Sequence, residues 1–249
     1  MTVQNQINDI INFVNAQQQH LIAHEKRLNK LALQNQLLKG ASGSKSQFYQ
    51  DLFVFNESGR KRNGYFVEFG GTDGVEGSNS HFLEKEHGWQ GIVAEPAKCW
   101  HERLRSNRQC HIDVRCVWNQ SGETIKFCES ESATLSTASE FVDSDMHSAE
   151  RKARLASYDV ETVSLLDLLE QHQAPAVIDY LSIDTEGSEL LILSSFDFDK
   201  YDIRILTVEH NWTPDRDKIH ALLASHGYER KHVDLTDCDD WYVRTAMQP

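Results

Sequence analysis

Hydrophobic positions in the first 38 residues repeat with a period of seven, and no glycine or proline interrupts them. The pattern extends over about five heptads, and a seam of this length is typical of a coiled coil. It predicts an oligomerisation helix over residues 1–39. One register places Ile7, Val14, Leu21, Leu28 and Asn35 at the a positions and Val3, Ile10, Gln17, His24, Leu31 and Leu38 at the d positions.

Three positions in this seam are polar, namely Gln17, His24 and Asn35. Polar seam residues lower the stability of a coiled coil but select its register and its number of strands. We interpret His24 as a neutral histidine that shares hydrogen bonds across the seam, rather than as a pH switch or a metal ligand. The pattern therefore predicts self-association through residues 3–38 into a dimer or trimer. The alternative is one amphipathic helix that packs on its own body.

The pattern changes beyond Gly40, where GASGS is typical of a flexible linker, placed at residues 40–45. In residues 46–249, short β-rich runs alternate with helical stretches. This alternation indicates an α/β domain with a mostly parallel sheet, helices on both faces and a ligand site at the carboxyl ends of the strands. The predicted strands are Tyr65–Phe69, Gln90–Ala94, Cys110–Val114, Ile125–Cys128, Tyr180–Ile183, Arg204–Glu209 and Trp241–Arg244, and the predicted helices are Ser46–Phe55, Asn79–His87, Cys99–Ser106, Ser164–His172, Gly187–Ser194 and Arg216–His226.

The formal net charge of the chain is −13, and residues 1–45 carry more basic than acidic residues, so the acidity lies in the predicted domain. An acidic body repels a phosphate backbone, which argues against nucleic acid as a partner. The five cysteines form no C-x-x-C pair, so neither a disulfide framework nor a zinc knuckle is indicated. Neither a membrane span nor a signal peptide is predicted. These features favour a cytoplasmic protein.

The stretch FVEFGGTDG, residues 66–74, joins a predicted strand to a glycine loop. Gly70, Gly71 and Gly74 would let the backbone turn sharply and approach a ligand closely. The spacing departs from the G-x-G-x-x-G fingerprint of dinucleotide binding, and the sequence contains no G-x-x-x-x-G-K-[ST] loop. A ligand without phosphate groups is therefore favoured.

Glu95 ends the next predicted strand, after GIVA. A carboxylate at the tip of a second strand accepts hydrogen bonds from a ribose diol. S-adenosylmethionine combines a ribose with an ammonium and a sulfonium group and has no phosphate. We therefore predict that Glu95 holds this ribose while Glu68 and Asp73 balance the positive charge. The alternatives are that Glu68 caps a loop and that Glu95 is a surface acid before a proline.

A second group of acids follows two later strands. In DYLSIDTEGSELLIL, Asp184 ends an apolar run and Glu186 follows it, and in RILTVEHNW the run ends at Glu209 and His210. Acids that directly follow apolar strands, on the ligand-binding edge of a sheet, are better site candidates than scattered surface acids. We expect these four residues to gather beside the methyl donor.

The segments SQFYQD, KRNGYFVEFGGTDG, NSHFLEKEHGWQGIVAEP, SLLDLLEQHQAPAVIDYLSIDTEGSELLIL and LTVEHN together resemble the FkbM family of S-adenosylmethionine-dependent methyltransferases. The resemblance covers about residues 46–245, and the N-terminal stalk is not part of it. It implies a Rossmann-like class I methyltransferase fold with a seven-stranded sheet. It also implies methyl transfer to an oxygen, commonly a sugar hydroxyl of a glycan or natural product.

The resemblance also assigns individual positions in this sequence. Gly71 lies within the matched donor loop. The positions that match are Glu68, Gly70, Asp73 and Gly74 in the donor loop, Glu95 as the ribose acid, Asp113 with Val114 beside the adenine, Asp184 and Glu186 in a D-x-E-G motif, and Glu209 and His210 in the motif after the fifth strand.

A sugar hydroxyl is a poor nucleophile, so a general base or a metal ion assists its methylation. His210 is the first candidate for the base, followed by Asp184 and Glu209. The same three residues resemble the ligands around Mg²⁺ in other sugar O-methyltransferases, although Mg²⁺ prefers oxygen ligands to histidine. The alternative is that this cluster only orients the acceptor through hydrogen bonds.

Two further features leave their roles open. Residues 130–158 are polar and loop-like with a charged helical piece, and they predict either a lid or acceptor loop or a solvated surface. The basic residues Arg151, Lys152 and Arg154 would suit an acidic or phosphorylated glycan, or they form a solvated helix face. Trp212, Trp241 and Tyr242 either stack on sugar rings or pack in the core. The main functional hypothesis is an O-methyltransferase acting on a saccharide. The alternatives are a lipid or natural-product acceptor, or a degenerate enzyme that serves as an oligomeric scaffold.

Overall fold

The computed structural model describes residues 3–38, 42–130, 133–153, 155–233 and 236–245. The chain divides into two compact units, residues 1–41 and residues 42–249. Within the described residues, no helix is both long enough and apolar enough to cross a membrane. Residues 40 and 41 of the predicted linker lie outside the described part, whereas Ser44 and Lys45 both donate hydrogen bonds to the Asp51 carboxylate.

The first unit is a single helix, α1 (Val3–Leu38), of 36 residues. Its leucines, glutamines and alanines are good helix formers, and the segment has no proline. The described apolar side chains of the predicted seam are exposed, with Leu21 at an a position 70% exposed and Ile10 at a d position 62% exposed. The helix is as predicted, and its pairing with other copies stays a prediction.

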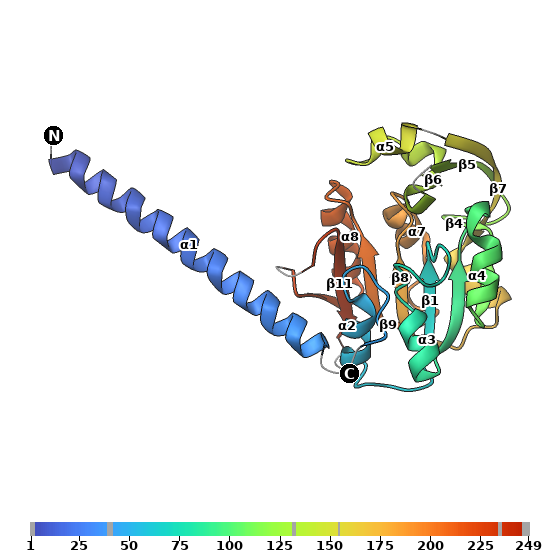
Figure 1. Cartoon of the computed structure of the whole chain (residues 1–249). Coiled ribbons are helices and arrows are strands. Elements are labelled where there is room, and N and C mark those ends of the chain that lie inside the picture. Colours follow the sequence, from blue (N-terminus) through green and yellow to red (C-terminus); the bar gives the residue numbers. More distant parts are fainter. Residues whose placement is uncertain (1–2, 39–41, 131–132, 154, 234–235, 246–249) are drawn as a thin grey trace. The chain divides into compact units, whose positions relative to one another are not determined.

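The second unit is built on a seven-stranded sheet in the order β10-β11-β9-β8-β1-β2-β3 (Figure 1). The five strands from β9 to β3 are parallel, whereas β11 pairs antiparallel with both β9 and β10. The predicted α/β class is confirmed, and the sheet is mixed. The strands are β1 (Tyr65–Phe69), β2 (Gln90–Ala94), β3 (His111–Asp113), β8 (Val177–Ile183), β9 (Asp202–Glu209), β10 (Tyr228–Lys231) and β11 (Asp239–Arg244).

Helices cover both faces of this sheet. The side chains of β1 alternate between the two faces and so contact both layers of helices. Val67 and Phe69 belong to a core cluster with apolar residues of α6 (Leu165–Gln171), α7 (Glu189–Ser195) and α8 (Asp215–Ser225). Phe66 and Glu68 point to the other face, where Arg108 contacts both. Arg108 follows α4 (His101–Asn107) and also contacts α3 (His81–His87), while α2 (Gln50–Glu57) precedes β1.

A second sheet has four strands in the order β4-β7-β5-β6. These are β4 (Cys116–Trp118), β5 (Thr124–Ser130), β6 (Thr137–Ala138) and β7 (Leu155–Ser164). The prediction of a loop over residues 130–158 is therefore wrong for β6 and for the start of β7. The charged helical piece is present as α5 (Ser148–Ala153), and the remaining short elements are the 3₁₀ turns η1 (Lys98–Trp100), η2 (Ala133–Leu135) and η3 (Ser139–Phe141).

Two of the three late aromatics pack in the core. Trp241 stacks on Phe53, with ring centroids 4.6 Å apart, and Tyr242 is fully buried in the main cluster. Trp212 differs from both because more than half of its surface is exposed.

Candidate active site

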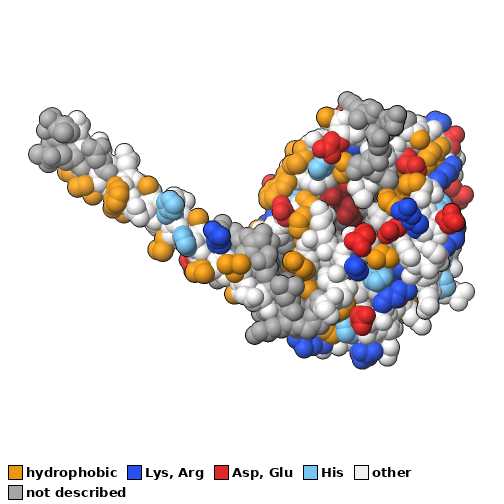
Figure 2. Space-filling model, viewed as in Figure 1, with side chains coloured by type: hydrophobic (Ala, Val, Ile, Leu, Met, Phe, Trp, Pro, Cys, Tyr) orange, Lys and Arg blue, Asp and Glu red, His pale blue; other side chains and the backbone are white. Residues whose placement is uncertain are grey.

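A cavity of about 370 Å³ opens at the carboxyl ends of β1, β2, β8 and β9. Figure 2 shows acidic side chains deep in a hollow of the body, with hydrophobic side chains along its edge. The structure brings five of the predicted site residues to the cavity wall, namely Gly70, Glu95, Asp184, Glu186 and Glu209. Its apolar wall includes Cys116, Val117 and Phe127 from the second sheet.

The loop after β1 turns against β8 at Gly70. This residue has φ 75°, and a Cβ atom there would lie 2.0 Å from the carbonyl oxygen of Asp184. No side chain fits at that distance, so glycine is required for the loop to close on the end of β8. A Cβ atom on Gly71 would meet Val93 of β2 at 2.3 Å. The two glycines therefore let this loop pack between its neighbouring strands.

Glu95 follows β2, and its carboxylate is fixed at the cavity. Its oxygens accept backbone hydrogen bonds from Thr72 and Ala97, both at 2.8 Å. Burial raises the pKa of Glu95 to about 7, against the opposing effect of these two bonds. The residue is 4% exposed. Glu95 is therefore not an exposed surface acid, which its position before Pro96 had left as an alternative. The carboxylate lone pairs that accept no hydrogen bond from Thr72 or Ala97 are available to a ligand.

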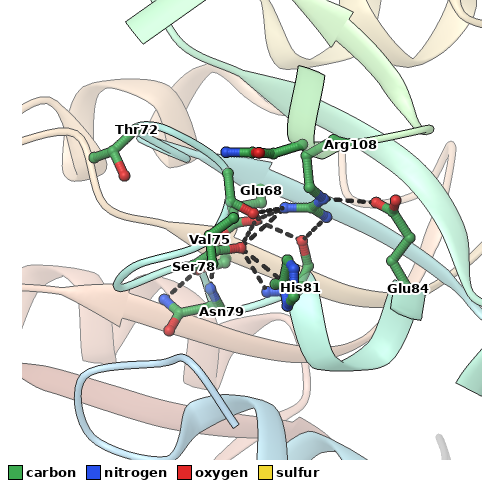
Figure 3. Close-up of polar contacts among 12 residues, drawn as sticks. Glu68, Thr72, Val75, Ser78, Asn79, His81, Glu84 and Arg108 are labelled. Carbon is green, nitrogen blue, oxygen red and sulfur yellow. Dashed lines mark hydrogen bonds and ion pairs between the residues drawn. The ribbon is translucent and has the colours of Figure 1, made fainter. Parts of the chain in front are cut away.

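Glu68 lies elsewhere, beneath the glycine loop that follows β1 (Figure 3). Its carboxylate accepts hydrogen bonds from Asn79 N at 2.5 Å, from Ser80 Oγ at 2.5 Å and from Ser78 Oγ at 2.9 Å. The Arg108 guanidinium lies 3.5 Å from it and is also paired with Glu84 at 2.6 Å. In this structure Glu68 therefore anchors the loop from below, as one of the sequence interpretations allowed, and it does not line the cavity.

Other matched positions also lie away from the cavity wall. Asp73 accepts hydrogen bonds from the backbone of Val75 and Glu76 and so shapes the turn that contains Gly74. Asp113 pairs with Arg115 at 2.6 Å, and the His172 ring lies 3.0 Å from the same carboxylate. Gly71, Asp73, Gly74, Asp113 and Val114 are not among the described residues that line the cavity.

Three acids meet at the ends of β8 and β9. One carboxylate oxygen from each of Asp184, Glu186 and Glu209 lies within 4.8 Å of the others. Burial and the nearby Glu189 carboxylate raise the pKa of Asp184 to about 7, although a hydrogen bond with Glu209 opposes the rise. Burial and Asp184 together raise the pKa of Glu209 well above its ordinary value. Two buried carboxyl groups this close disfavour simultaneous ionisation, so they titrate as a coupled pair.

Arg151 of α5 contacts one of the cavity acids, a role that the sequence did not predict. Its side chain is buried and pairs with Asp145 at 2.8 Å and with Glu186. Asn211 adds hydrogen bonds of 3.2 Å to the same two carboxylates. The interpretation of Arg151 as part of a wet helix face is therefore wrong. No local pattern distinguishes it from neighbouring basic residues, because its partner Glu186 is distant in sequence.

Burial raises the pKa of Glu186 to about 8, with a further rise from Asp184 that Arg151 opposes. Glu186 itself has φ 59°, in the left-handed region, and the next residue is Gly187 at φ 126°. This turn points the Glu186 carboxylate toward Arg151. Since the guanidinium already supplies a positive charge there, Glu186 is the most fully partnered of the three acids.

His210 lies beside the cavity acids in sequence but faces another way. Its Nδ1 accepts a hydrogen bond from the backbone N–H of Trp212 at 3.1 Å, and its Nε2 lies 3.8 Å from Asp240. Burial lowers the pKa of His210 to about 4, despite the opposing effect of Asp240. His210 lines a neighbouring cleft with Glu209 and Asn211 rather than the main cavity.

The mixed sheet, the glycine loop after its first strand and the acids at the ends of its parallel strands define an α/β domain with a candidate ligand site at one edge of the sheet. The family model named "Methyltransferase FkbM domain" matches residues 68–230. The chain therefore belongs to the FkbM methyltransferase family. No curated protein matches the sequence significantly.

Proposed function

We propose that the protein is an S-adenosylmethionine-dependent O-methyltransferase that methylates a hydroxyl group of a sugar or glycan. The observation that carries the proposal is the cavity itself. It has Glu95 at the end of β2, and the paired acids Asp184 and Glu209 lie at the ends of β8 and β9. A candidate carboxylate for the ribose diol and a candidate base thus line one cavity.

The residues present fit the proposed methyl donor. Glu95 offers carboxylate lone pairs to a ribose diol, and Val117 and Phe127 offer an apolar wall to an adenine ring. The glycine loop at Gly70 leaves room for close approach to the backbone. The cavity acids favour a cationic ligand over a phosphorylated one. When bound, the cofactor would supply the methyl group.

The Asp184–Glu209 pair is the proposed general base. A carboxylate oxygen of the pair would accept the proton of the acceptor hydroxyl, and efficient bases have pKa values near the working pH. The value of about 7 for Asp184 meets this condition, whereas the value of about 4 for His210 does not. His210 also has Nδ1 occupied by Trp212. We therefore prefer the acid pair to His210 as the base.

A divalent metal ion such as Mg²⁺ is a second candidate at the same acids. Three carboxylate oxygens lie within reach of one another, and Oε2 of Glu209 is buried without a hydrogen-bond partner among the described residues. The structure groups Glu186, rather than His210, with Asp184 and Glu209, which gives the all-oxygen set that Mg²⁺ prefers. The Arg151–Glu186 pair is the argument against this candidate, since it already supplies a cation.

The acceptor class rests on the family resemblance, and two other proposals remain. One is a lipid or non-sugar natural product as acceptor. The other is a degenerate enzyme whose α1 helix forms an oligomeric scaffold, with self-association through residues 3–38. Retained binding of the donor product is expected for either enzyme and not for the scaffold.

Calorimetric titration with S-adenosylhomocysteine tests the proposed function. Wild-type protein is expected to bind, and Glu95→Gln is expected to raise the Kd roughly tenfold to a hundredfold, because charge-assisted hydrogen bonds to the ribose are lost. Glu102→Gln, at an exposed position of α4, is the matched control and should leave the Kd unchanged. Each titration is repeated with Mg²⁺ and with EDTA. Absence of binding under both conditions would refute the methyltransferase proposal.

A further inference from the structure

Trp212 is a large aromatic residue left open to solvent at a site where the backbone is constrained. It is 54% exposed, and it follows β9 directly after His210 and Asn211. An exposed tryptophan forgoes the burial of a large apolar surface, so an exposed position within a cavity wall points to a ligand. Trp212 is one of the residues that line the cavity with Asp184 and Glu209.

The backbone around Trp212 is held in an unfavourable conformation. Asn211 has φ 41° and Trp212 has φ 57°, in the left-handed region that a bulky residue rarely adopts. Hydrogen bonds compensate for this strain, since Trp212 N donates to His210 Nδ1 and the Asn211 amide donates to Asp145 and Glu186. Such strain persists only where the surroundings enforce it, which is common at ligand sites.

The indole ring is itself positioned from two sides. The Arg216 guanidinium lies 4.9 Å from its centroid, and the His210 ring contacts it edge-on, with centroids 5.2 Å apart. His210 therefore supports the Trp212 ring, a role that does not require the histidine to accept a proton. The ring is therefore presented at the cavity in a defined orientation.

Other apolar side chains accompany Trp212 at the cavity. Met146, which is 66% exposed, and the half-buried Phe48 also line it, together with the acids Asp184 and Glu209. A wall that combines apolar and acidic side chains matches a ring that carries C–H groups on one face and hydroxyl groups at its edge. A pyranose has this character. Its axial C–H groups form an apolar face that can stack on an aromatic ring.

We propose that Trp212 is a specificity-determining residue that stacks on the apolar face of a pyranose ring and presents one ring hydroxyl to the Asp184–Glu209 pair. The inference rests on the proposed function and names the acceptor as a pyranoside. His210 acts through Trp212 as a positioning residue. The acceptor is thus recognised by the shape and polarity of its ring.

The test uses full-length protein that contains 5-fluorotryptophan, observed by ¹⁹F NMR. Trp89, Trp100, Trp118 and Trp241 provide internal controls. The probes are the methyl glycosides of glucose, galactose, mannose and rhamnose, each titrated with and without S-adenosylhomocysteine, with 2-phenylethanol and 1-octanol for comparison. We expect at least one glycoside to shift the Trp212 signal in a saturable way while the other four signals stay in place.

Variants separate stacking from a structural role. Trp212→Ala should weaken glycoside binding about tenfold, as seen by saturation-transfer NMR, whereas Trp212→Phe should retain most of it. Both variants should bind S-adenosylhomocysteine like the wild type. A Trp212 signal that no glycoside moves, or that only the two non-sugar alcohols move, would overturn the inference. Absence of S-adenosylhomocysteine binding by the wild type would instead count against the proposed function. The response of the Trp212 signal to glycosides would still decide whether Trp212 binds a sugar ring.

Discussion

At the residue scale, the Asp184 carboxyl group couples the stability of the fold to pH. Its pKa is about 7 in the folded chain and 3.8 ordinarily. Between these values the unfolded state has lost the proton and the folded state retains it, so the free energy of unfolding falls as the pH rises. We expect Asp184→Asn to stabilise the protein by about 1–3 kcal/mol at pH 8, with a smaller gain at pH 5.

Urea denaturation of wild type and variant at both pH values measures this effect. Asp199→Asn is the control, because Asp199 is an exposed acid outside the cavity. It should change the free energy of unfolding little at either pH. A gain for Asp184→Asn that is the same at pH 5 and pH 8 would show that its pKa is not raised in the folded protein.

Arg108 neutralises two acids near the glycine loop that follows β1. Its side chain has no exposed surface and contacts Glu68 and Glu84, and it holds the pKa of Glu84 below its ordinary value even though burial acts in the opposite direction. Removal of one partner of a buried ion pair typically costs about 3–5 kcal/mol. We expect Arg108→Met to lose this much free energy of unfolding at neutral pH.

Arg105→Met, at an exposed position of α4, is the matched control. The double variant Arg108→Met/Glu84→Gln should recover part of the loss in urea denaturation, because one uncompensated charge is removed with its partner. If Arg108→Met lowers the free energy of unfolding no more than the control does, this network contributes little to stability.

The positions of Glu95, Asp184 and Glu209 at one cavity could be predicted from the sequence. Each residue directly follows or ends an apolar strand, and the carboxyl ends of parallel strands meet at one edge. The direction of Glu68 was left open between two interpretations, and that of His210 could not be predicted. Glu68 is held by Ser78, Asn79 and Ser80 together with Arg108, so its direction is set by contacts that form only when the chain folds. His210 lies near Asp240, which is distant in sequence and is brought near only by the folded sheet.

At the element scale, six strands of the main sheet were predictable from their apolar runs, whereas β10 of that sheet and β4 and β7 of the second sheet were not predicted. The sequence of β7 does carry a strand pattern, since Val160 and Thr162 are buried and Asp159 and Glu161 are not. This alternation is typical of a strand with one solvent-facing side. The polar and serine-rich residues before β7 concealed the change of pattern. β6 has only two residues, too few for any periodicity.

The α1 helix carries a prediction that concerns assembly. Its seam residues Leu21 and Leu28 are exposed in the single chain, and an exposed apolar stripe of this length favours association with other copies. We expect the double variant Leu21→Glu/Leu28→Glu to be monomeric, because like charges would face one another in the seam. Analytical ultracentrifugation of full-length wild type should show a dimer or trimer.

The control for this variant lies on the same helix and adds the same number of negative charges away from the seam. Asn12 and Gln19 are exposed and are seven residues apart, both at the f position of the predicted register. The double variant Asn12→Asp/Gln19→Glu should leave the association unchanged, because f positions face away from the partner helix. A wild-type protein that sediments as a monomer at all concentrations would contradict the coiled-coil prediction.

At the scale of the whole molecule, the two units should respond to different partners. Residues 1–41 and residues 42–249 are separate compact units, and the residues that line the cavity in the described part of the chain all belong to the second. A ligand stabilises only the state that binds it, whereas self-association stabilises a unit in proportion to the logarithm of protein concentration. Differential scanning calorimetry should therefore resolve two transitions.

The Tm of the second unit should rise with the concentration of S-adenosylhomocysteine. The Tm of the first unit should rise with the concentration of protein. At ligand concentrations about 100 times the Kd, the added stability is about 2.7 kcal/mol, which corresponds to a rise in Tm of roughly 5–10 °C for a domain of this size. Glu95→Gln should reduce this rise, and Leu21→Glu/Leu28→Glu should abolish the concentration dependence. A single transition that responds to both variables would mean that the helix and the methyltransferase domain unfold as one cooperative unit, in which case the stalk would act on the site as well as on assembly.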